Sequence, residues 1–497
     1  MGTQGAQGAQ GAQGTLGTQG TQGAQGTQGT QGTQGTQGAQ GKQEMRERPN
    51  IVFILVDDMG WTDAGCFGSE YYETPNIDRL AAEGVKFTNA YANAPNCAPS
   101  RASLMCGKYT PRHGILTVNA SEKGEDWQRK LIPTPNKTVL GLEHATIAEA
   151  LKEAGYACGH VGKWHLGEGP QMGPLGRGFD FNAGGIHKGQ PPAGYFSPYE
   201  IATLPDGPEG EYLTDRLTDE ALTFIEGHAD RPFFLYFAHY SVHTPLQAKE
   251  EQVAKYREKP ASGGHRHPVY AGMLESTDES VGRVMAKLAE LGIDDRTLVV
   301  LFSDNGGLGG YAGDGIVGQE VTDQAPLRGG KGMIYEGGIR VPMIVRWPGV
   351  ADAGAVNETP VIGSDFFPTF LEAAGVLPAE HPELDGESLM PLMTGGGTLS
   401  RDALFWHFPV YIQALPESPK MRATPCAAVR QGDWKLIEHF EHDRLELYNL
   451  KDDIGERRDL SEQCPDQATA LHKLLLDWRE ELGVTVPTEP NPAYRPQ

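Results

Sequence analysis

The chain has 497 residues, of which 65 are glycine, and glycine recurs at every third position from Gly2 to Gly41. Between these two glycines the only aliphatic side chain larger than alanine is Leu16, so this segment cannot form a hydrophobic core. The rest of the chain carries nearly all of the net charge of -23, and an acidic surface disfavours nucleic acid and anionic membranes as partners. The longest apolar runs, at 51–56 and 232–238, are too short to span a bilayer.

The Gly-x-y period is typical of collagen, but none of its triplets contains proline, which would pre-set the extended conformation of a triple helix. We therefore expect residues 1–44 to be a flexible tail, and a trimeric stalk is the alternative. Deletion of 1–44 should leave any activity of the remaining chain intact. The N-terminus has neither a basic start nor an apolar stretch, so it does not read as a signal peptide.

The six cysteines show no CxxC spacing, and the chain is long enough to be stabilised by a core. This pattern indicates neither a disulfide framework nor a structural zinc site. Most of the cysteines are expected to be buried apolar residues.

After residue 49, apolar runs alternate with amphipathic segments. The run at 51–56 is continuously apolar with β-branched residues, which is typical of a strand buried on both faces, and the segments at 157–162, 232–240 and 297–303 are also predicted to be strands. Helical periodicity and end signals predict helices over 74–84, 145–156, 211–229 and 275–292. This alternation predicts an α/β domain with a largely parallel sheet.

The pattern changes near residue 395, where the glycine-rich stretch 393–402 reads as a linker. Short alternating segments at 426–440 and 444–450 follow, and then a helix over 467–483. We expect a main domain over 47–395 and a smaller subdomain over 400–497, built from an antiparallel sheet and one covering helix.

Polar side chains follow each of the four predicted strands. In chain order they are Asp57 and Asp58, then Lys163 and His165, then His243, then Asp304 and Asn305. Because parallel strands end at one edge of a sheet, we expect these side chains to converge on one site.

The converging residue types indicate an anion-binding metal site. The oxygen donors Asp57, Asp58, Asp304 and Asn305 suit Ca²⁺ or Mg²⁺ better than zinc. Positive charge and proton transfer would come from Arg101, Lys163, His165, His243 and Lys331. Together these groups point to an oxyanion substrate such as sulfate or phosphate.

A local motif sharpens this interpretation. Residues 96–114 read NCAPSRASLMCGKYTPRHG, and the C-x-P-S-R order from Cys97 to Arg101 resembles the signature of type I, formylglycine-dependent sulfatases. Cys106 stands where that family usually has threonine. The segments VDDMGWTD, GKWHLG, VHTPLQA, SDNGG and PLRGGKGMIYEGGIRVPMIVRWPG follow the family's order, so the resemblance to arylsulfatase-like members of the alkaline phosphatase superfamily spans about 49–482.

The resemblance implies an alkaline-phosphatase-like α/β sandwich with a large, mostly parallel sheet flanked by helices. It also implies that a maturation enzyme oxidises Cys97 to formylglycine, whose hydrated aldehyde supplies the nucleophilic oxygen. One Ca²⁺ per subunit would be held by Asp57, Asp58, Asp304, Asn305 and the modified Cys97.

The family pattern also assigns the remaining candidate residues. Arg101 would hold the hydrated aldehyde, and Lys163 would contact it together with the sulfate. His165 would remove a hydroxyl proton to expel sulfate. His243 and Lys331 would bind the sulfate and protonate the leaving oxygen.

The expected function is hydrolysis of a sulfate ester, foremost of a sulfated carbohydrate, with aryl sulfates as artificial substrates. The insertions at 115–140 and 170–212 would line the substrate pocket. Two alternatives stay open: a phosphonate monoester or phosphodiester hydrolase on the same scaffold, and a non-enzymatic glycan-binding assembly protein with a Gly-x-y stalk. Relatives of this kind are commonly periplasmic or secreted, and the sequence leaves location open.

Overall fold

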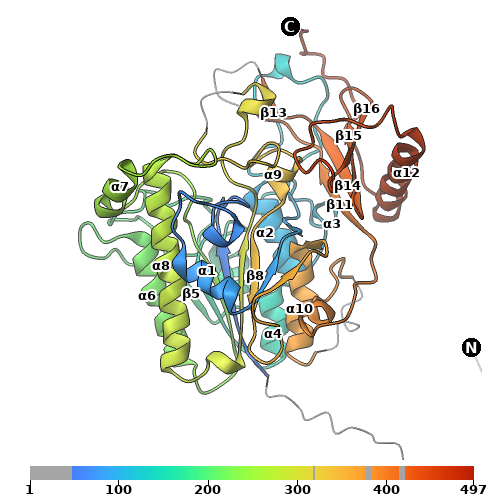
Figure 1. The fold of residues 1–497 in the computed structure, drawn as a ribbon. Coiled ribbons are helices and arrows are strands. Elements are labelled where there is room, and N and C mark those ends of the chain that lie inside the picture. The colour runs from blue at the N-terminus through green and yellow to red at the C-terminus, as the bar shows by residue number, and fades with distance from the viewer. Residues whose placement is uncertain (1–47, 317–319, 377–382, 414–419, 497) are drawn as a thin grey trace, which may run out of the picture. The chain divides into compact units, whose positions relative to one another are not determined.

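The computed structural model describes residues 48–316, 320–376, 383–413 and 420–496 (Figure 1). The Gly-x-y segment, for which we expect a flexible tail, lies outside the described residues. The described residues all belong to one compact unit that begins at Glu47.

The centre of this unit is an eight-stranded sheet with the order β5-β4-β6-β1-β7-β8-β2-β9. The first five of these strands run parallel, whereas β8 is antiparallel to both of its neighbours. This confirms the prediction of a largely parallel sheet. The strands are β1 (Asn50–Val56), β2 (Val85–Phe87), β4 (Ala157–Gly162), β5 (Phe181–Ala183), β6 (Phe233–Ala238), β7 (Thr297–Ser303), β8 (Met343–Arg346) and β9 (Ala355–Asn357).

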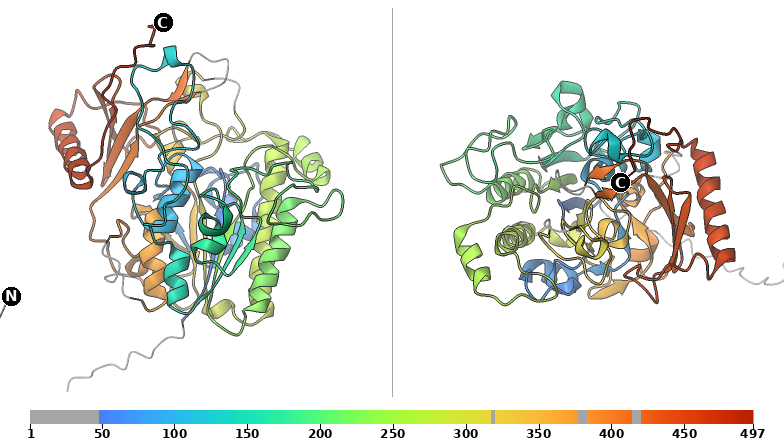
Figure 2. Two further views of the ribbon diagram at one scale, coloured as in Figure 1. Left: turned by 180° about the vertical axis from the view of Figure 1, so that it is seen from behind. Right: turned by 90° about the horizontal axis from the view of Figure 1, so that it is seen from above.

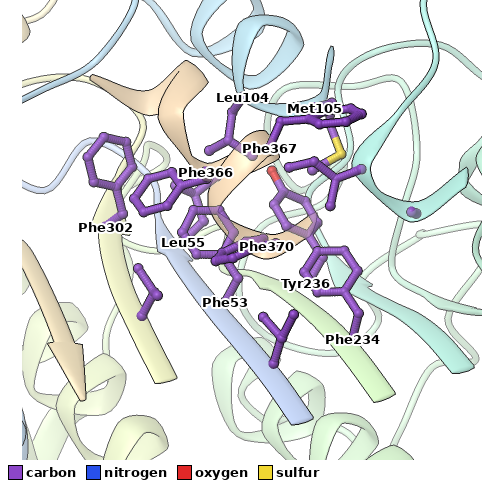
Figure 3. Packing of buried hydrophobic residues seen from close by; sticks show 14 of the residues in the cluster. Phe53, Leu55, Leu104, Met105, Phe234, Tyr236, Phe302, Phe366, Phe367 and Phe370 are labelled. Carbon is purple, nitrogen blue, oxygen red and sulfur yellow. The ribbon is translucent and has the colours of Figure 1, made fainter. Parts of the chain in front are cut away.

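The apolar run of β1 is buried on both faces of the sheet. Ile51, Phe53 and Leu55 point into one core, and the alternate residues Val52, Ile54 and Val56 point into the other. Figure 3 shows the first core, where Phe53 contacts the rings of the helix that begins at Phe366. This position therefore requires a strand whose residues are all hydrophobic, rather than one that is hydrophobic at alternate residues.

Helices cover both faces of the sheet (Figures 1 and 2). One core is completed by α1 (Pro75–Ala82), α6 (Leu213–Gly227) and α8 (Pro268–Glu290), with α7 (Glu250–Arg257) beside α8. The other is completed by α2 (Cys97–Cys106), α4 (Ile147–Glu153) and α10 (Phe366–Ala373). The short helices are α3 (Thr110–His113), α5 (Gly169–Met172), α9 (Glu336–Ile339) and α11 (Met390–Met393).

Two helix starts differ from their sequence signals. Thr74 precedes α1 as expected, but its side chain does not cap the helix; instead the Asp278 carboxylate of α8 accepts hydrogen bonds from the backbone N–H groups of Asn76 and Ile77. A carboxylate from a neighbouring helix thus satisfies the free amides that a local cap normally binds. Helix α8 begins at Pro268, well before the predicted start, with His267 as its N-cap.

The C-terminal part forms a four-stranded antiparallel sheet in the order β11-β14-β15-β16. Helix α12 (Pro465–Leu482) packs on it through Leu471, Leu475 and Trp478. This confirms the predicted antiparallel sheet with one covering helix. Its strands are β11 (Ala403–Phe408), β14 (Cys426–Gln431), β15 (Trp434–His439) and β16 (Arg444–Asn449); the short pairs are β3 (Ala90–Tyr91) with β10 (Val361–Ile362), and β12 (Ile412–Gln413) with β13 (Met421–Ala423).

Across the described residues, the helices are all too short or too polar to cross a membrane.

We expect Gly162→Ala to destabilise the protein by more than about 2 kcal/mol. Gly162 ends β4 with a φ of +97°, and a Cβ there would lie 1.9 Å from the Ala238 carbonyl oxygen of β6. Gly155→Ala is a matched control, because Gly155 also has a positive φ, +86°, but its Cβ would meet nothing closer than 3.9 Å. The control should cost only about 1 kcal/mol. Equal losses in chemical denaturation of the two variants would contradict this steric account.

Candidate active site

The carboxyl ends of four neighbouring parallel strands, β4, β6, β1 and β7, meet at one edge of the central sheet. The polar residues that follow these strands converge there with the first residue of α2. Ligand atoms of Asp57, Cys97 and Asp304 all lie within 4.8 Å of one another, and all three residues are buried. Three segments far apart in sequence thereby form one cluster.

Cys97 lies at the N-terminus of α2, where it is 2% exposed. The preceding loop is held by Ser100, whose hydroxyl donates to the Ala94 carbonyl at 2.8 Å and accepts from the Ala94 N–H at 3.2 Å. Burial raises the pKa of the Cys97 thiol. The free amides of the first helical turn favour negative charge at this position.

Asp57 lies beside both a cation and a second carboxylate. Its Oδ2 accepts a hydrogen bond from Lys163 Nζ at 2.6 Å, while its buried Oδ1 has no hydrogen-bond partner. Burial and the nearby charge of Asp304 raise the pKa of Asp57 to about 8, and Lys163 offsets only part of this effect. The Asp57 and Asp304 carboxyl groups therefore need more positive charge nearby for both to be ionised.

The Asp58 carboxylate has different partners from that of Asp57. Its carboxylate lies 2.6 Å from Lys331 Nζ and accepts a hydrogen bond from Asn305 Nδ2 at 2.8 Å. Although burial opposes ionisation, Lys331 and His243 hold the pKa of Asp58 below its usual range. His243 Nε2 lies 3.8 Å from Asp58 Oδ2, and its Nδ1 donates to the Thr244 carbonyl.

Arg101 connects the chain segments that carry Asp304, Lys163 and Asp57. Its Nε donates to Asp304 Oδ2 at 2.7 Å, and its Nη1 donates to the Lys163 carbonyl at 2.8 Å. The guanidinium is fully buried, and its Nη2 lies 3.9 Å from Asp57 Oδ1. A buried cation with this geometry fixes the relative positions of the strands that end at Asp57 and Asp304.

His165 faces a residue that sequence analysis did not single out. Its backbone is left-handed, with a φ of 65°, and its Nδ1 is buried without a partner. The ring of His187 lies 6.3 Å away, centroid to centroid, and the Nδ1 of His187 is buried and unpartnered as well. No local pattern marks His187; only the fold brings it to the site. Gly189 makes room for His165, since a Cβ there would lie 2.6 Å from the ring.

The donor set fits a hard divalent cation. Buried oxygens without hydrogen-bond partners occur on Asp57 Oδ1 and Asn305 Oδ1, and Asp304 lies in the same cluster. Carboxylate and amide oxygens are the ligands that Ca²⁺ prefers. Three carboxylates and three basic side chains nearly balance at this site, so a divalent cation would make it net positive and suited to an anion.

The segment that carries Lys331 is anchored to the C-terminal sheet. Lys435 Nζ, from β15, donates to the Ile334 carbonyl at 3.0 Å and to Glu336 Oε1 at 2.9 Å. It also lies 2.8 Å from Glu456 Oε1. All three ionisable side chains are buried, so the network fixes the segment through charge pairs shielded from water.

Taken together, the structure gathers every candidate residue at this edge of the sheet. Asp57, Cys97 and Asp304 form the compact donor cluster, and Asn305 adds an unpartnered oxygen. Asp58 lies outside that compact cluster, where it binds Lys331. The basic and histidine residues around them are Arg101, Lys163, His165, His243 and Lys331.

Comparison with protein families gives a consistent picture. Residues 49–376 match the family model for sulfatases, and residues 330–481 match the model described as N-sulphoglucosamine sulphohydrolase, C-terminal. A sulfatase of Formosa agariphila is 32% identical over 86% of this chain and 87% of that protein. Human N-acetylgalactosamine-6-sulfatase is 32% identical over 89% of this chain and 87% of its own length.

Solved structures agree with this comparison. The structure of Ps i-CgsB in complex with k-i-k-neocarrahexaose is 30% identical, with a TM-score of 0.71 over 87% of this chain and 93% of that chain. The phosphonate monoester hydrolase of Agrobacterium radiobacter is 22% identical with a TM-score of 0.64, over 88% of this chain and 96% of that chain, and shares the fold. These matches confirm the resemblance inferred from the motifs: the chain belongs to the sulfatase family of sulfuric ester hydrolases.

Proposed function

We propose that this protein hydrolyses sulfate esters of carbohydrates, with a nucleophile derived from Cys97. The observation that carries the proposal is the position of Cys97, which begins a helix and lies in one buried cluster with Asp57 and Asp304. Around this cluster stand Arg101, Lys163 and Lys331, which can hold an anion within an otherwise acidic protein. Oxidation of Cys97 to formylglycine by a maturation enzyme would place a hydrated aldehyde there.

The proposed reaction has two covalent steps. One hydroxyl of the hydrated aldehyde gives its proton to water and forms a bond to sulfur while the bond from sulfur to the sugar oxygen breaks, and that oxygen takes a proton from Lys331 or His243. His165 then accepts the proton of the second hydroxyl, the bond between the former aldehyde carbon and the sulfate oxygen breaks, and sulfate leaves as the aldehyde re-forms; addition of water restores the diol. Arg101 and Lys163 would orient the diol and the sulfate.

A single Ca²⁺, held by Asp57, Asp58, Asp304, Asn305 and the modified Cys97, would supply positive charge that stabilises the charge developing on the sulfate oxygens. Asp58 would then share its carboxylate between this role and its contact with Lys331.

The carbohydrate assignment draws on the relatives. One 32%-identical relative is named for N-acetylgalactosamine 6-sulfate, and a 30%-identical structure contains k-i-k-neocarrahexaose. The phosphonate monoester hydrolase shares only the fold at 22% identity, so it lends no support to phosphonate or phosphodiester chemistry here.

Relative turnover of three esters tests the proposal. We expect the mature enzyme to hydrolyse 4-nitrophenyl sulfate with a much larger kcat/KM than bis(4-nitrophenyl) phosphate or 4-nitrophenyl phenylphosphonate. A preference for either phosphorus ester would overturn the sulfatase assignment and favour the alternative on the same scaffold. Absence of all hydrolysis from fully matured protein would instead favour the glycan-binding alternative.

Calcium should stabilise the chelator-treated protein against heat. Binding to the folded state alone contributes about 2.7 kcal/mol when free Ca²⁺ is 100 times its Kd, so the unfolding temperature should rise on addition of Ca²⁺. Asp304→Asn should lose most of this rise, whereas Asp215→Asn, which changes a carboxylate outside the site, should keep it. An undiminished rise in Asp304→Asn would place the cation elsewhere.

A further inference from the structure

Arg422 reaches from the C-terminal part of the chain to the turn that carries Lys331. It lies in β13, the short strand that pairs with β12. Its Nη1 donates a hydrogen bond to the Lys331 backbone carbonyl at 3.3 Å. The same carbonyl accepts a hydrogen bond from the Tyr311 hydroxyl at 2.9 Å. Two side chains that are distant in sequence therefore hold the same peptide group of the active-site turn.

Arg422 and Tyr311 also support each other. The Arg422 guanidinium lies over the Tyr311 ring, 4.4 Å from its centroid, and Tyr311 is fully buried. A cation in this position is attracted by the face of the ring. The stem of Arg422 packs close to the backbone that follows Lys331, since a Cβ on Gly332 would lie 3.0 Å from Arg422 Cδ. Contact of these three groups fixes one side of the turn.

The turn needs anchors of this kind because its own sequence is conformationally free. Gly329 and Gly332 flank Lys331 with φ values of +70° and +85°, a region in which glycine alone is unstrained. Two further anchors are backbone hydrogen bonds: the Lys331 N–H donates to the Gly307 carbonyl at 2.9 Å, and the Gly332 N–H donates to the Pro95 carbonyl at 2.7 Å. The backbone position of Lys331 thus depends on tertiary contacts, and Arg422 is the one that comes from the C-terminal part.

We propose that Arg422 is a positioning residue for Lys331. By holding the Lys331 carbonyl, it places the ammonium group, which lies 2.6 Å from the Asp58 carboxylate, where the leaving oxygen is protonated. The inference rests on the proposed function, in which Lys331 is a candidate proton donor, and adds that the C-terminal part acts on this step through Arg422. A small misplacement of a catalytic group costs a large factor in rate.

Two esters with leaving groups of different basicity test this role. Phenolate is a more basic leaving group than 4-nitrophenolate, so hydrolysis of phenyl sulfate depends more strongly on proton donation. Arg422→Met keeps an unbranched stem but loses the guanidinium. It should lower kcat/KM for phenyl sulfate about tenfold more than for 4-nitrophenyl sulfate. Any weakening of sulfate binding affects both esters alike and cancels in the ratio of the two values.

The control for this experiment is Arg444→Met, which removes an exposed arginine of β16 that pairs with Glu446. It should leave the ratio unchanged. Arg422→Lys, which retains a donor and a charge, should restore part of the ratio. If Arg422→Met does not fold, Tyr311→Phe removes the other donor to the Lys331 carbonyl and should shift the ratio in the same direction.

A double variant shows whether Arg422 acts through Lys331. Lys331→Ala should change the ratio at least as much as Arg422→Met, and adding Arg422→Met to Lys331→Ala should change it no further. An additional change in the double variant would mean that Arg422 acts on another group, and no change in Lys331→Ala would mean that Lys331 is not the proton donor. Either result overturns the inference.

Failure of this inference is distinct from failure of the proposed function. If the matured wild type hydrolyses neither ester, the sulfatase proposal itself fails. If the wild type is active but folded Arg422→Met loses the same factor on both esters, or loses nothing, Arg422 does not position the proton donor and only this inference is overturned.

Discussion

Replacement of Cys97 by alanine should lower the hydrolysis of 4-nitrophenyl sulfate at least about a thousandfold, because the variant has no side chain that can become the nucleophile. The fold should survive, since the change removes one small buried atom at the start of α2. The loss is measured as kcat/KM on purified protein. Because the four other proposed Ca²⁺ ligands remain, a calcium-dependent rise in unfolding temperature should persist in this variant, although it should be smaller than in the wild type.

Cys106→Ala is the matched control for this experiment. Cys106 ends the same helix and is equally buried, but it lies outside the cluster of Asp57, Cys97 and Asp304. The control should keep activity close to wild type. A Cys97→Ala variant that retains more than about a tenth of the activity would rule out Cys97 as the source of the nucleophile.

The second large effect concerns stability. Lys435→Met should lower the free energy of unfolding by about 3–5 kcal/mol, because among the described residues it leaves the buried Glu456 carboxylate without an ion-pair partner and Glu336 with Arg340 alone. All three side chains are buried, and Lys435 also donates to the Ile334 carbonyl. Because this network anchors the segment that bears Lys331, kcat should fall as well. Chemical denaturation at fixed calcium concentration measures the first effect.

Two further variants show how much of the stability loss comes from the buried charge. In Lys473→Met the lost lysine is exposed and pairs with Asp477 on the surface of α12, so the cost should stay below about 0.5 kcal/mol. Adding Glu456→Gln to Lys435→Met should recover part of the loss, because one unpaired charge is removed. A loss in Lys435→Met no larger than that of the surface control would mean that the network contributes little.

The parts of the fold that could be predicted are those in which local pattern and burial agree. The run of β1 is apolar throughout because both faces of the strand are covered, and this marks a central strand without further information. Once the strands are parallel, their carboxyl ends share an edge. Residues as distant as Asp57 and Asp304 could therefore be placed together from sequence.

Other features depend on contacts that no local pattern records. Helix α2 is buried on every side, so its sequence lacks the amphipathic period that would have revealed it. Similarly, the cap of α1 comes from Asp278 rather than from the adjacent Thr74. His187 reaches His165 only because β5 pairs with β4 in the sheet and the chain that follows β5 lies beside His165, whose N–H donates to the Ile186 carbonyl.

The different contacts made by the Asp57 and Asp58 carboxylates also depend on the fold. From sequence, Asp57 and Asp58 are equivalent oxygen donors. In the structure Asp57 contacts Lys163 and keeps an unpartnered oxygen, whereas Asp58, with its left-handed backbone, turns toward Lys331 and Asn305. Adjacent residues at a strand end point in different directions, so Asp57 faces Lys163 and Asp58 faces Lys331.

The central claim is that Cys97 becomes the nucleophile by oxidation, and the mass of the peptide spanning 92–101 tests it most directly. Formylglycine is about 18 Da lighter than cysteine. Across preparations matured to different extents, the specific activity toward 4-nitrophenyl sulfate should rise in proportion to the lighter peptide and extrapolate to zero without it. Full activity in protein whose Cys97 is entirely unmodified would contradict the account.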